Sequence, residues 1–169
     1  RLRSGFPEAK HIDISGLLSA DDFYYTDSHW RQERITKVAD EIAAQMGAER
    51  IGTCEIQDTG RPFYGVYYGQ AALPHAPERL FYLDNAVIRG LKVYNVETQS
   101  DIPVYDLGAA AGRDPYEMFL GGARSIIKIT NPNAAKERRL IVFRDSFGSS
   151  IAPLLAAGYS EITLVDIRY

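Results

Sequence analysis

The sequence predicts an α/β domain built as a three-layer α/β/α sandwich around a mainly parallel sheet. The apolar run at residues 140–143 is typical of a strand that is covered on both faces of such a sheet. A helical pattern at 146–157 and a strand-like segment at 161–167 complete a strand–helix–strand unit, which favours this fold. With 169 residues, of which 46% are hydrophobic, the chain can form a hydrophobic core. We therefore expect a single domain over residues 1–169.

The first two thirds of the chain predict a mixture of helix, short strands and loops. Apolar residues at three- and four-residue spacing predict a helix over residues 30–46 that ends at Gly47. The short β-like segments that follow occupy residues 51–56, 62–68, 79–83 and 91–96. We interpret about 50–110 as an insertion of strands and loops that forms one wall of a cleft. A brief helix is expected at 115–119 and a further strand at 125–130.

The composition excludes several classes of partner. The net charge of −3 gives no electrostatic reason to expect nucleic acid or an anionic membrane surface. The sequence has no run of about 18 apolar residues, so we expect no direct membrane insertion. Cys54 is the single cysteine, which excludes a disulfide framework and a thiolate metal site. We expect neither a metal nor a cofactor.

The sequence shows no targeting segment. It begins at Arg1 without an initiator methionine or a signal peptide, and it stops directly after a strand-like segment. We expect a trimmed chain, with an export signal or anchor and further strands lying outside it.

Two short motifs far apart in the sequence carry the candidate chemistry. Asp27 and His29 follow an aromatic stretch near the start, and Ser146 follows the apolar run near the end. A Ser–His–Asp set is recognised by geometry and roles, so its order along the chain is free to vary. If the fold brings His29 to Ser146, these residues form a site for covalent acyl transfer or ester hydrolysis.

Ser146 lies three residues beyond the apolar run, where a strand gives way to a helix. Unpaired amides at a helix start favour developing negative charge, so the N–H group of Ser146 or Phe147 is a candidate oxyanion donor. The alternative is that Ser146 only caps the helix and satisfies its first amides.

His29 is the candidate general base because an imidazole exchanges protons near neutral pH. Asp27 lies two residues earlier, so in an extended segment both side chains point to the same side and the carboxylate can fix the ring tautomer. The alternative is a structural, hydrogen-bonded histidine at a helix start. A metal site made of Asp27, His29 and His75 lacks any known ligand spacing.

The motifs resemble those of a known family. Residues 25–30, Tyr-Thr-Asp-Ser-His-Trp, resemble the signature of the DHHW family of bacterial envelope proteins, and residues 114–122 resemble its middle motif. Residues 143–150 and 165–169 resemble its C-terminal block. The Asp-x-His and Asp-Ser-Phe blocks also resemble the SGNH-like domains of alginate O-acetyltransferases, in which the Asp-His motif likewise precedes the serine. The resemblance implies an SGNH-hydrolase-like fold with reversed motif order.

The resemblance also implies roles for the triad. Ser146 would be the nucleophile, His29 the general base and Asp27 the residue that orients His29. Ser28 stands where the family motif has its first histidine. Because Ser28 lies between the two triad residues, it is expected to face away and to leave the chemistry intact.

Further site residues are implied around the triad. Tyr25 and Trp30 would flank the site, and Gly121, Gly122 and Arg144 would contribute substrate or oxyanion contacts. No segment matches the asparagine block of SGNH enzymes, so the oxyanion donors are left open.

These observations lead to one expected function and two alternatives. We expect acyl transfer, of acetyl above all, to or from hydroxyls of a cell-envelope polysaccharide, outside the cytoplasm, with a membrane acyl-donor protein as partner. A carbohydrate acetylesterase would use the same residues with water as acceptor. A non-catalytic glycan-binding envelope protein would keep the fold without the chemistry. The tyrosines grouped at 64–68 suit polar organic ligands, although packing under loops also explains them.

Overall fold

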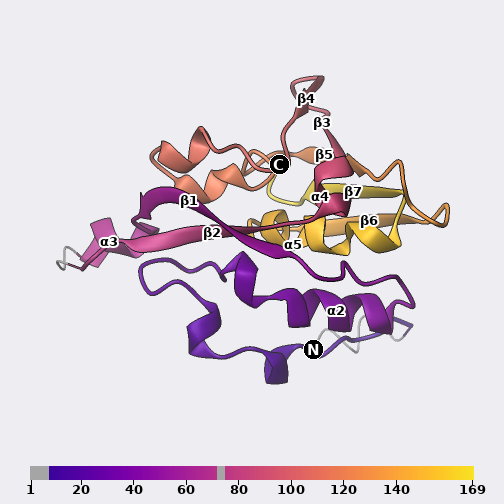
Figure 1. The fold of residues 1–169 in the computed structure, drawn as a ribbon, viewed down its shortest axis with the longest axis horizontal. Helices are drawn as coiled ribbons and strands as arrows, with labels where there is room; N and C mark the ends of the chain where they lie inside the picture. Colours follow the sequence, from indigo (N-terminus) through magenta and orange to yellow (C-terminus); the bar gives the residue numbers. More distant parts are fainter. Residues whose placement is uncertain (1–7, 72–74) are drawn as a thin grey trace.

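The structure is a computed structural model that describes residues 8–71 and 75–169. Its strands form a five-stranded sheet in the order β4-β3-β5-β7-β6 and a separate two-stranded ribbon, β1-β2 (Figure 1). The strands are β1 (Glu55–Phe63), β2 (Glu78–Asp84), β3 (Lys92–Asn95), β4 (Ser100–Ile102), β5 (Ile126–Thr130), β6 (Arg139–Arg144) and β7 (Glu161–Asp166).

The helices are short. The α-helices are α2 (Thr36–Gln45), α3 (Val66–Ala71), α4 (Ala86–Gly90) and α5 (Phe147–Leu155). The 3₁₀ turns are η1 (Ser15–Leu17), η2 (Ala20–Asp22), η3 (Gln32–Arg34), η4 (Ala109–Ala111), η5 (Pro115–Met118) and η6 (Ala156–Gly158). Helix α5 packs against α2, and both lie on the same side of the five-stranded sheet (Figure 1). Among the described helices, none has the length and apolar character needed to cross a bilayer.

The expected mainly parallel sheet is wrong. Only β6 and β7, which flank α5, pair in parallel. Strand β5 runs antiparallel to β7, β3 antiparallel to β5, and β4 antiparallel to β3. The strand–helix–strand pattern specifies the one parallel pair, because its crossover is local. The direction of the other strands depends on long irregular connections, which a hydrophobic pattern does not encode.

The expected three-layer sandwich is also wrong. On β6, Ile141 and Phe143 are 64% and 70% exposed, whereas Leu140 and Val142 pack against the main core. The apolar run had predicted a strand covered on both faces. In the described residues, helices cover one face of the sheet and leave the other open at this edge strand.

A second, smaller core supports the segment that carries Asp27 and His29. Phe63 of β1 and Leu80 of β2 pack there with Tyr24 and Tyr116. The expected insertion at 50–110 therefore divides: β1, α3 and β2 lie beside the site, whereas β3 and β4 extend the main sheet.

Candidate active site

Ser146, His29 and Asp27 meet in one hydrogen-bonded line. The Ser146 Oγ lies 2.6 Å from His29 Nε2, and His29 Nδ1 lies 2.5 Å from Asp27 Oδ1. Because an ionised carboxylate can only accept, Nδ1 carries the proton and Nε2 accepts the hydrogen bond from the Ser146 hydroxyl. The arrangement has the geometry of a nucleophile, a base and an orienting carboxylate.

Asp27 is fixed by more than the histidine. Its Oδ1 also accepts the His29 backbone N–H at 2.9 Å, and its Oδ2 accepts the Val66 N–H at 2.9 Å. Burial raises the pKa of Asp27, but the hydrogen bonds from the His29 ring and from the Val66 and His29 N–H groups outweigh it and bring the pKa below its ordinary value. The carboxylate is therefore ionised at neutral pH, as the orienting role requires.

Glu78, at the start of β2, holds the backbone just before Asp27. Its carboxylate accepts the N–H groups of Tyr25 at 3.0 Å and Thr26 at 2.8 Å, the Thr26 hydroxyl at 2.8 Å and the Arg31 guanidinium at 2.6 Å. Burial raises the pKa of Glu78, and these donors together lower it below its ordinary value. Sequence reasoning missed this residue, because no local pattern links it to a loop 52 residues earlier.

The ring of His29 is held between two aromatic side chains. Tyr116 stacks on it at 4.0 Å between ring centroids with an interplanar angle of 13°, and Phe147 lies at 5.0 Å. The Tyr116 hydroxyl donates to Ser150 Oγ at 2.8 Å, and burial raises the pKa of Tyr116, so the hydroxyl stays protonated. Tyr116 is a second residue that was not predicted as part of the site, although it lies within the middle motif at residues 114–122.

Ser146 occupies the N-cap position just before α5, but its side chain does not cap the helix. Its side chain makes no capping hydrogen bond, and its hydroxyl is directed to His29 instead. The Phe147 N–H, one of the two expected oxyanion donors, donates to Asp145 Oδ1 at 3.0 Å. This amide is therefore not free to bind an oxyanion. Among the described residues, no backbone or side-chain acceptor contacts the Ser146 N–H, which leaves it as the candidate donor.

The serine opens into a pocket of about 160 Å³. Its lining consists of His29, Asp114, Tyr116, Glu117, Gly122, Ala123, Ser146, Ser149 and Arg168. The Arg168 guanidinium is bound to both oxygens of Asp166, at 2.9 and 2.6 Å, and holds the pKa of that carboxyl at about 2. Arg168 thus shares the Asp166 carboxylate with Arg144, whereas Asp114 and Glu117 make no ion pair within the described residues.

The other predicted site residues differ in how close they lie to the serine pocket. Gly122 lines the pocket, and both Gly121 and Gly122 adopt positive φ values, 69° and 75°, as the expected turn requires. Tyr25 is 77% exposed and stacks on His75 at 4.7 Å, away from the pocket lining. Trp30 lies beneath the site, where its indole N–H donates to Ser150 Oγ at 2.8 Å.

Arg144 is buried behind the site. Its guanidinium donates to Ser149 Oγ at 3.0 Å and to the carbonyl oxygens of Gly122 and Arg124 at 3.3 Å, and it lies 3.5 Å from Asp166. It does not line the pocket. Arg144 therefore joins α5, the 121–124 loop and the end of β7, rather than offering a contact to a substrate.

A metal centre has no support in the described part of the chain. No group of three or more His, Cys, Asp and Glu side chains converges there. His75, the third member of the set considered from the sequence, stacks on Tyr25 and lies against the Ala76 carbonyl oxygen, with its Nδ1 at 2.6 Å.

Solved structures of similar fold support the architecture. A DHHW family protein from Eubacterium siraeum superposes with a TM-score of 0.68 at 21% identity, over 88% of this chain and 52% of that one. Bacillus cereus PatB1 with a sulfonyl adduct superposes with a TM-score of 0.66 at 21% identity, over 88% of this chain and 52% of PatB1. Another structure of Bacillus cereus PatB1 superposes with a TM-score of 0.61 at 20% identity, over 88% of this chain and 54% of that one. At such identities the likeness shows the fold alone.

The chain spans about half the length of these solved structures. A search among curated proteins gave no significant match. The model of the DHHW protein family matches residues 18–165, which include both motifs of the site. The chain therefore belongs to the DHHW protein family.

Proposed function

We propose that this chain carries a serine-dependent acyl-transfer site, with Ser146 as nucleophile, His29 as general base and Asp27 as the orienting carboxylate. The observation that carries the proposal is the unbroken line from Ser146 Oγ through His29 to Asp27, with spacings of 2.6 and 2.5 Å. The 2.6 Å between Ser146 Oγ and His29 Nε2 lies within the reach of a proton transfer, and the 2.5 Å between His29 Nδ1 and Asp27 Oδ1 is a hydrogen bond that holds the ring. The likeness of the two motifs to those of alginate O-acetyltransferase domains supports the same assignment.

The reaction runs in two steps. Ser146 Oγ attacks the carbonyl carbon of an acyl donor while its proton passes to His29 Nε2, and the donor's leaving group departs with that proton. The acceptor hydroxyl then attacks the acyl-enzyme, gives its proton to His29 Nε2, and Ser146 Oγ recovers a proton from His29 as it leaves. In both steps the Tyr116 ring favours the positive charge that the imidazole acquires.

The negative charge on the tetrahedral oxygen needs donors inside the pocket. The Ser146 N–H, just before α5, is one candidate. Ala123 also lines the pocket, and its N–H is a second candidate, whereas the Gly122 N–H already donates to the Phe119 carbonyl oxygen at 3.0 Å. Losing one such donor typically costs about 3 kcal/mol of transition-state stabilisation.

The acceptor in this proposal is a sugar hydroxyl rather than water. The serine pocket shares Asp114 and Glu117 with a larger cavity of about 670 Å³, which offers room for a polyhydroxylated acceptor. If water were the acceptor, the protein would be an acetylesterase. Supplying p-nitrophenyl acetate with an oligosaccharide and recovering the acetyl group separates the two, as acetylated sugar or as free acetate.

The setting is also part of the proposal. A cell-envelope polysaccharide as acceptor, a membrane acyl-donor protein as source of the acyl group and a location outside the cytoplasm all follow from the resemblance of the motifs to bacterial envelope proteins. Cell fractionation with an antibody to this chain tests the location.

The first experiment is covalent labelling. PatB1, which is similar in fold, has been solved with a sulfonyl adduct, so a sulfonyl fluoride is a suitable probe. We expect one adduct per chain, mapped to Ser146, and its loss in His29→Ala and Ser146→Ala. The matched control is Ser28→Ala, which removes an exposed hydroxyl between the triad residues and should label like the wild type. An unlabelled but folded wild-type chain would refute the proposal.

A further inference from the structure

The serine pocket is one end of a series of adjoining cavities. The cavity of about 670 Å³ shares Asp114 and Glu117 with the serine pocket. A third cavity, of about 320 Å³, shares Tyr64 and Arg113 with the second. The three volumes therefore follow one another from Ser146 outward. A series of this kind suits a linear ligand with several similar units.

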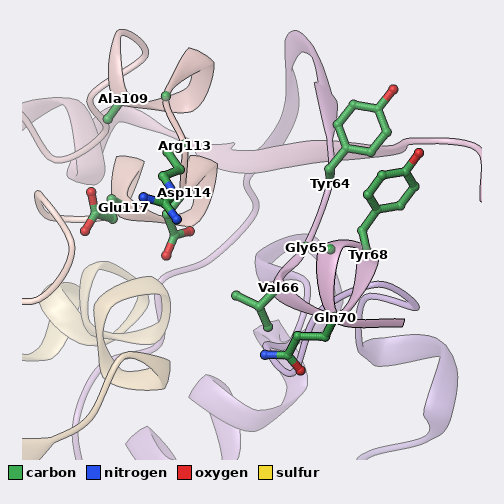
Figure 2. A pocket seen from close by; sticks show the side chains of 11 residues that line it. Tyr64, Gly65, Val66, Tyr68, Gln70, Ala109, Arg113, Asp114 and Glu117 are labelled. Atoms are coloured by element: carbon green, nitrogen blue, oxygen red, sulfur yellow. The ribbon is translucent and has the colours of Figure 1, made fainter. Parts of the chain in front are cut away.

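The middle cavity has walls of different chemistry. One wall comes from η4 and η5 and carries Arg113, Asp114 and Glu117, as Figure 2 shows. The other comes from α3 and the residues before it, and in Figure 2 the side chains of Val66 and Gln70 extend from it toward the charged wall.

Two tyrosines stand at the edge of the second wall. Tyr64 and Tyr68 lie 4.7 Å apart between ring centroids, and Tyr64 is 44% exposed. Tyr68 is half-buried. A pair of rings at the edge of a cavity offers apolar faces together with hydroxyl groups, a combination that matches the C–H faces and hydroxyls of sugars.

The charges along the series change sign with distance from the serine. Asp114 and Glu117, which are shared with the serine pocket, are both exposed carboxylates without an ion pair among the described residues. Arg168 beside them shares the Asp166 carboxylate with Arg144, so negative charge predominates at this end. Arg113 and Arg61 line the outer cavity, and no carboxylate pairs with either of them among residues 8–71 and 75–169. The inner end thus repels anions, whereas the outer end attracts them.

We propose that these three cavities form one groove for a linear oligosaccharide acceptor, with a sugar that bears no negative charge at Ser146 and the chain passing Tyr64 and Arg113. The proposal deepens the acyl-transfer function and rests on it. Polymers in which every sugar is a uronate are disfavoured, because one of their carboxylates would face Asp114 and Glu117.

Binding can be measured without turnover. Titration calorimetry on Ser146→Ala should show binding of an N-acetylglucosamine tetramer, and binding of a galacturonate tetramer should be weaker by about tenfold. Adding Tyr64→Ala to the Ser146→Ala protein should weaken its affinity for the neutral tetramer by about tenfold, which is the effect of losing one aromatic contact. The matched control is Tyr67→Ala, since Tyr67 lies on α3 and is similarly exposed but lines none of the three cavities.

A second variant tests the charge argument. Replacing Asp114→Asn and Glu117→Gln together keeps the shapes, and the Asn side chain can still accept the Tyr116 N–H that Asp114 accepts at 3.1 Å. The galacturonate tetramer should then bind within about threefold of the neutral one. Equal binding of both tetramers to the parent protein, or no binding of either, would overturn the groove, as would equal losses from Tyr64→Ala and Tyr67→Ala.

The two proposals fail in different ways. If the sulfonyl fluoride labels Ser146 and no tetramer binds, the serine chemistry stands and the groove is refuted. If the tetramers bind as expected and Ser146 stays unlabelled, the groove is a binding site and the acyl-transfer function is refuted.

Discussion

Replacing Asp27→Asn should nearly abolish acylation of Ser146 while leaving the fold intact. The Asp27 carboxylate accepts three N–H groups: Oδ1 accepts the ring and backbone N–H of His29, and Oδ2 accepts that of Val66. An asparagine has the same shape but only one oxygen. Its NH₂ group must face either His29 or Val66.

Either orientation of the asparagine leaves one backbone N–H without an acceptor, and the two differ in what happens to the histidine ring. If the amide oxygen faces His29, the NH₂ group opposes the Val66 N–H and leaves it unsatisfied, at a cost of about 1–3 kcal/mol. If the NH₂ group faces His29, the ring moves its proton from Nδ1 to Nε2, and the His29 backbone N–H loses its acceptor in place of the Val66 N–H. That tautomer points an N–H at Ser146 Oγ and cannot take its proton. The precedent of a triad aspartate changed to asparagine puts the loss at about 10⁴-fold in rate.

The assay is the pre-steady-state burst of p-nitrophenol from p-nitrophenyl acetate, which reports acylation directly. Asp27→Asn should show a burst slower by about four orders of magnitude, while the melting temperature falls by about 10 °C or less because of the one unsatisfied N–H. A burst rate within about tenfold of the wild type, in a folded protein, would show that Asp27 does not set the tautomer.

Three further predictions concern the support of the site. Glu78→Gln should lower the unfolding free energy by about 2 kcal/mol. The folded state lowers the pKa of Glu78 below its ordinary value of 4.5, so the stability that the ionised carboxylate contributes is full above that pH and is lost as the pH falls through the folded-state pKa. In urea melts the difference in unfolding free energy between wild type and variant should therefore narrow in acid, and a constant difference contradicts this. In Gly65→Ala the new Cβ would overlap the Thr26 carbonyl, so both melting temperature and burst rate should drop; unchanged values would contradict the contact. Ser28→His, at an exposed position, should keep the burst rate within about twofold.

The sequence indicated which candidate residues the fold brings together better than it indicated the fold itself, because the signals for those residues are local. Asp27 and His29 are two residues apart, and Ser146 lies at a strand–helix boundary, so short-range pattern was enough to select them. Glu78 and Tyr116 act on the same loop from distant segments, and nothing in their own neighbourhood indicates it.

The fold depended on contacts that the pattern does not contain. The β6–α5–β7 unit was predictable from its local crossover, whereas the antiparallel placement of β5 against β7 was not. Residues 62–68 were expected as a strand, yet β1 ends at Phe63 and α3 begins at Val66. Between them Gly65 packs against the Thr26 backbone, and this tertiary contact overrides the β-propensity of the tyrosines.

The contact between α3 and the 26–27 segment has a consequence for the order of events in catalysis. Thr26 and Asp27 accept the N–H groups of Gly65, Val66 and Tyr67, so the helix that forms one wall of the groove is anchored to the residue that orients the base. A ligand that tightens α3 also tightens Asp27, and by reciprocity an acylated serine changes the affinity of the groove. Because the base already lies in its working geometry without a ligand, acylation of Ser146 in the proposed reaction does not wait for the sugar. The coupling then acts after acylation, on the affinity of the groove for the acceptor.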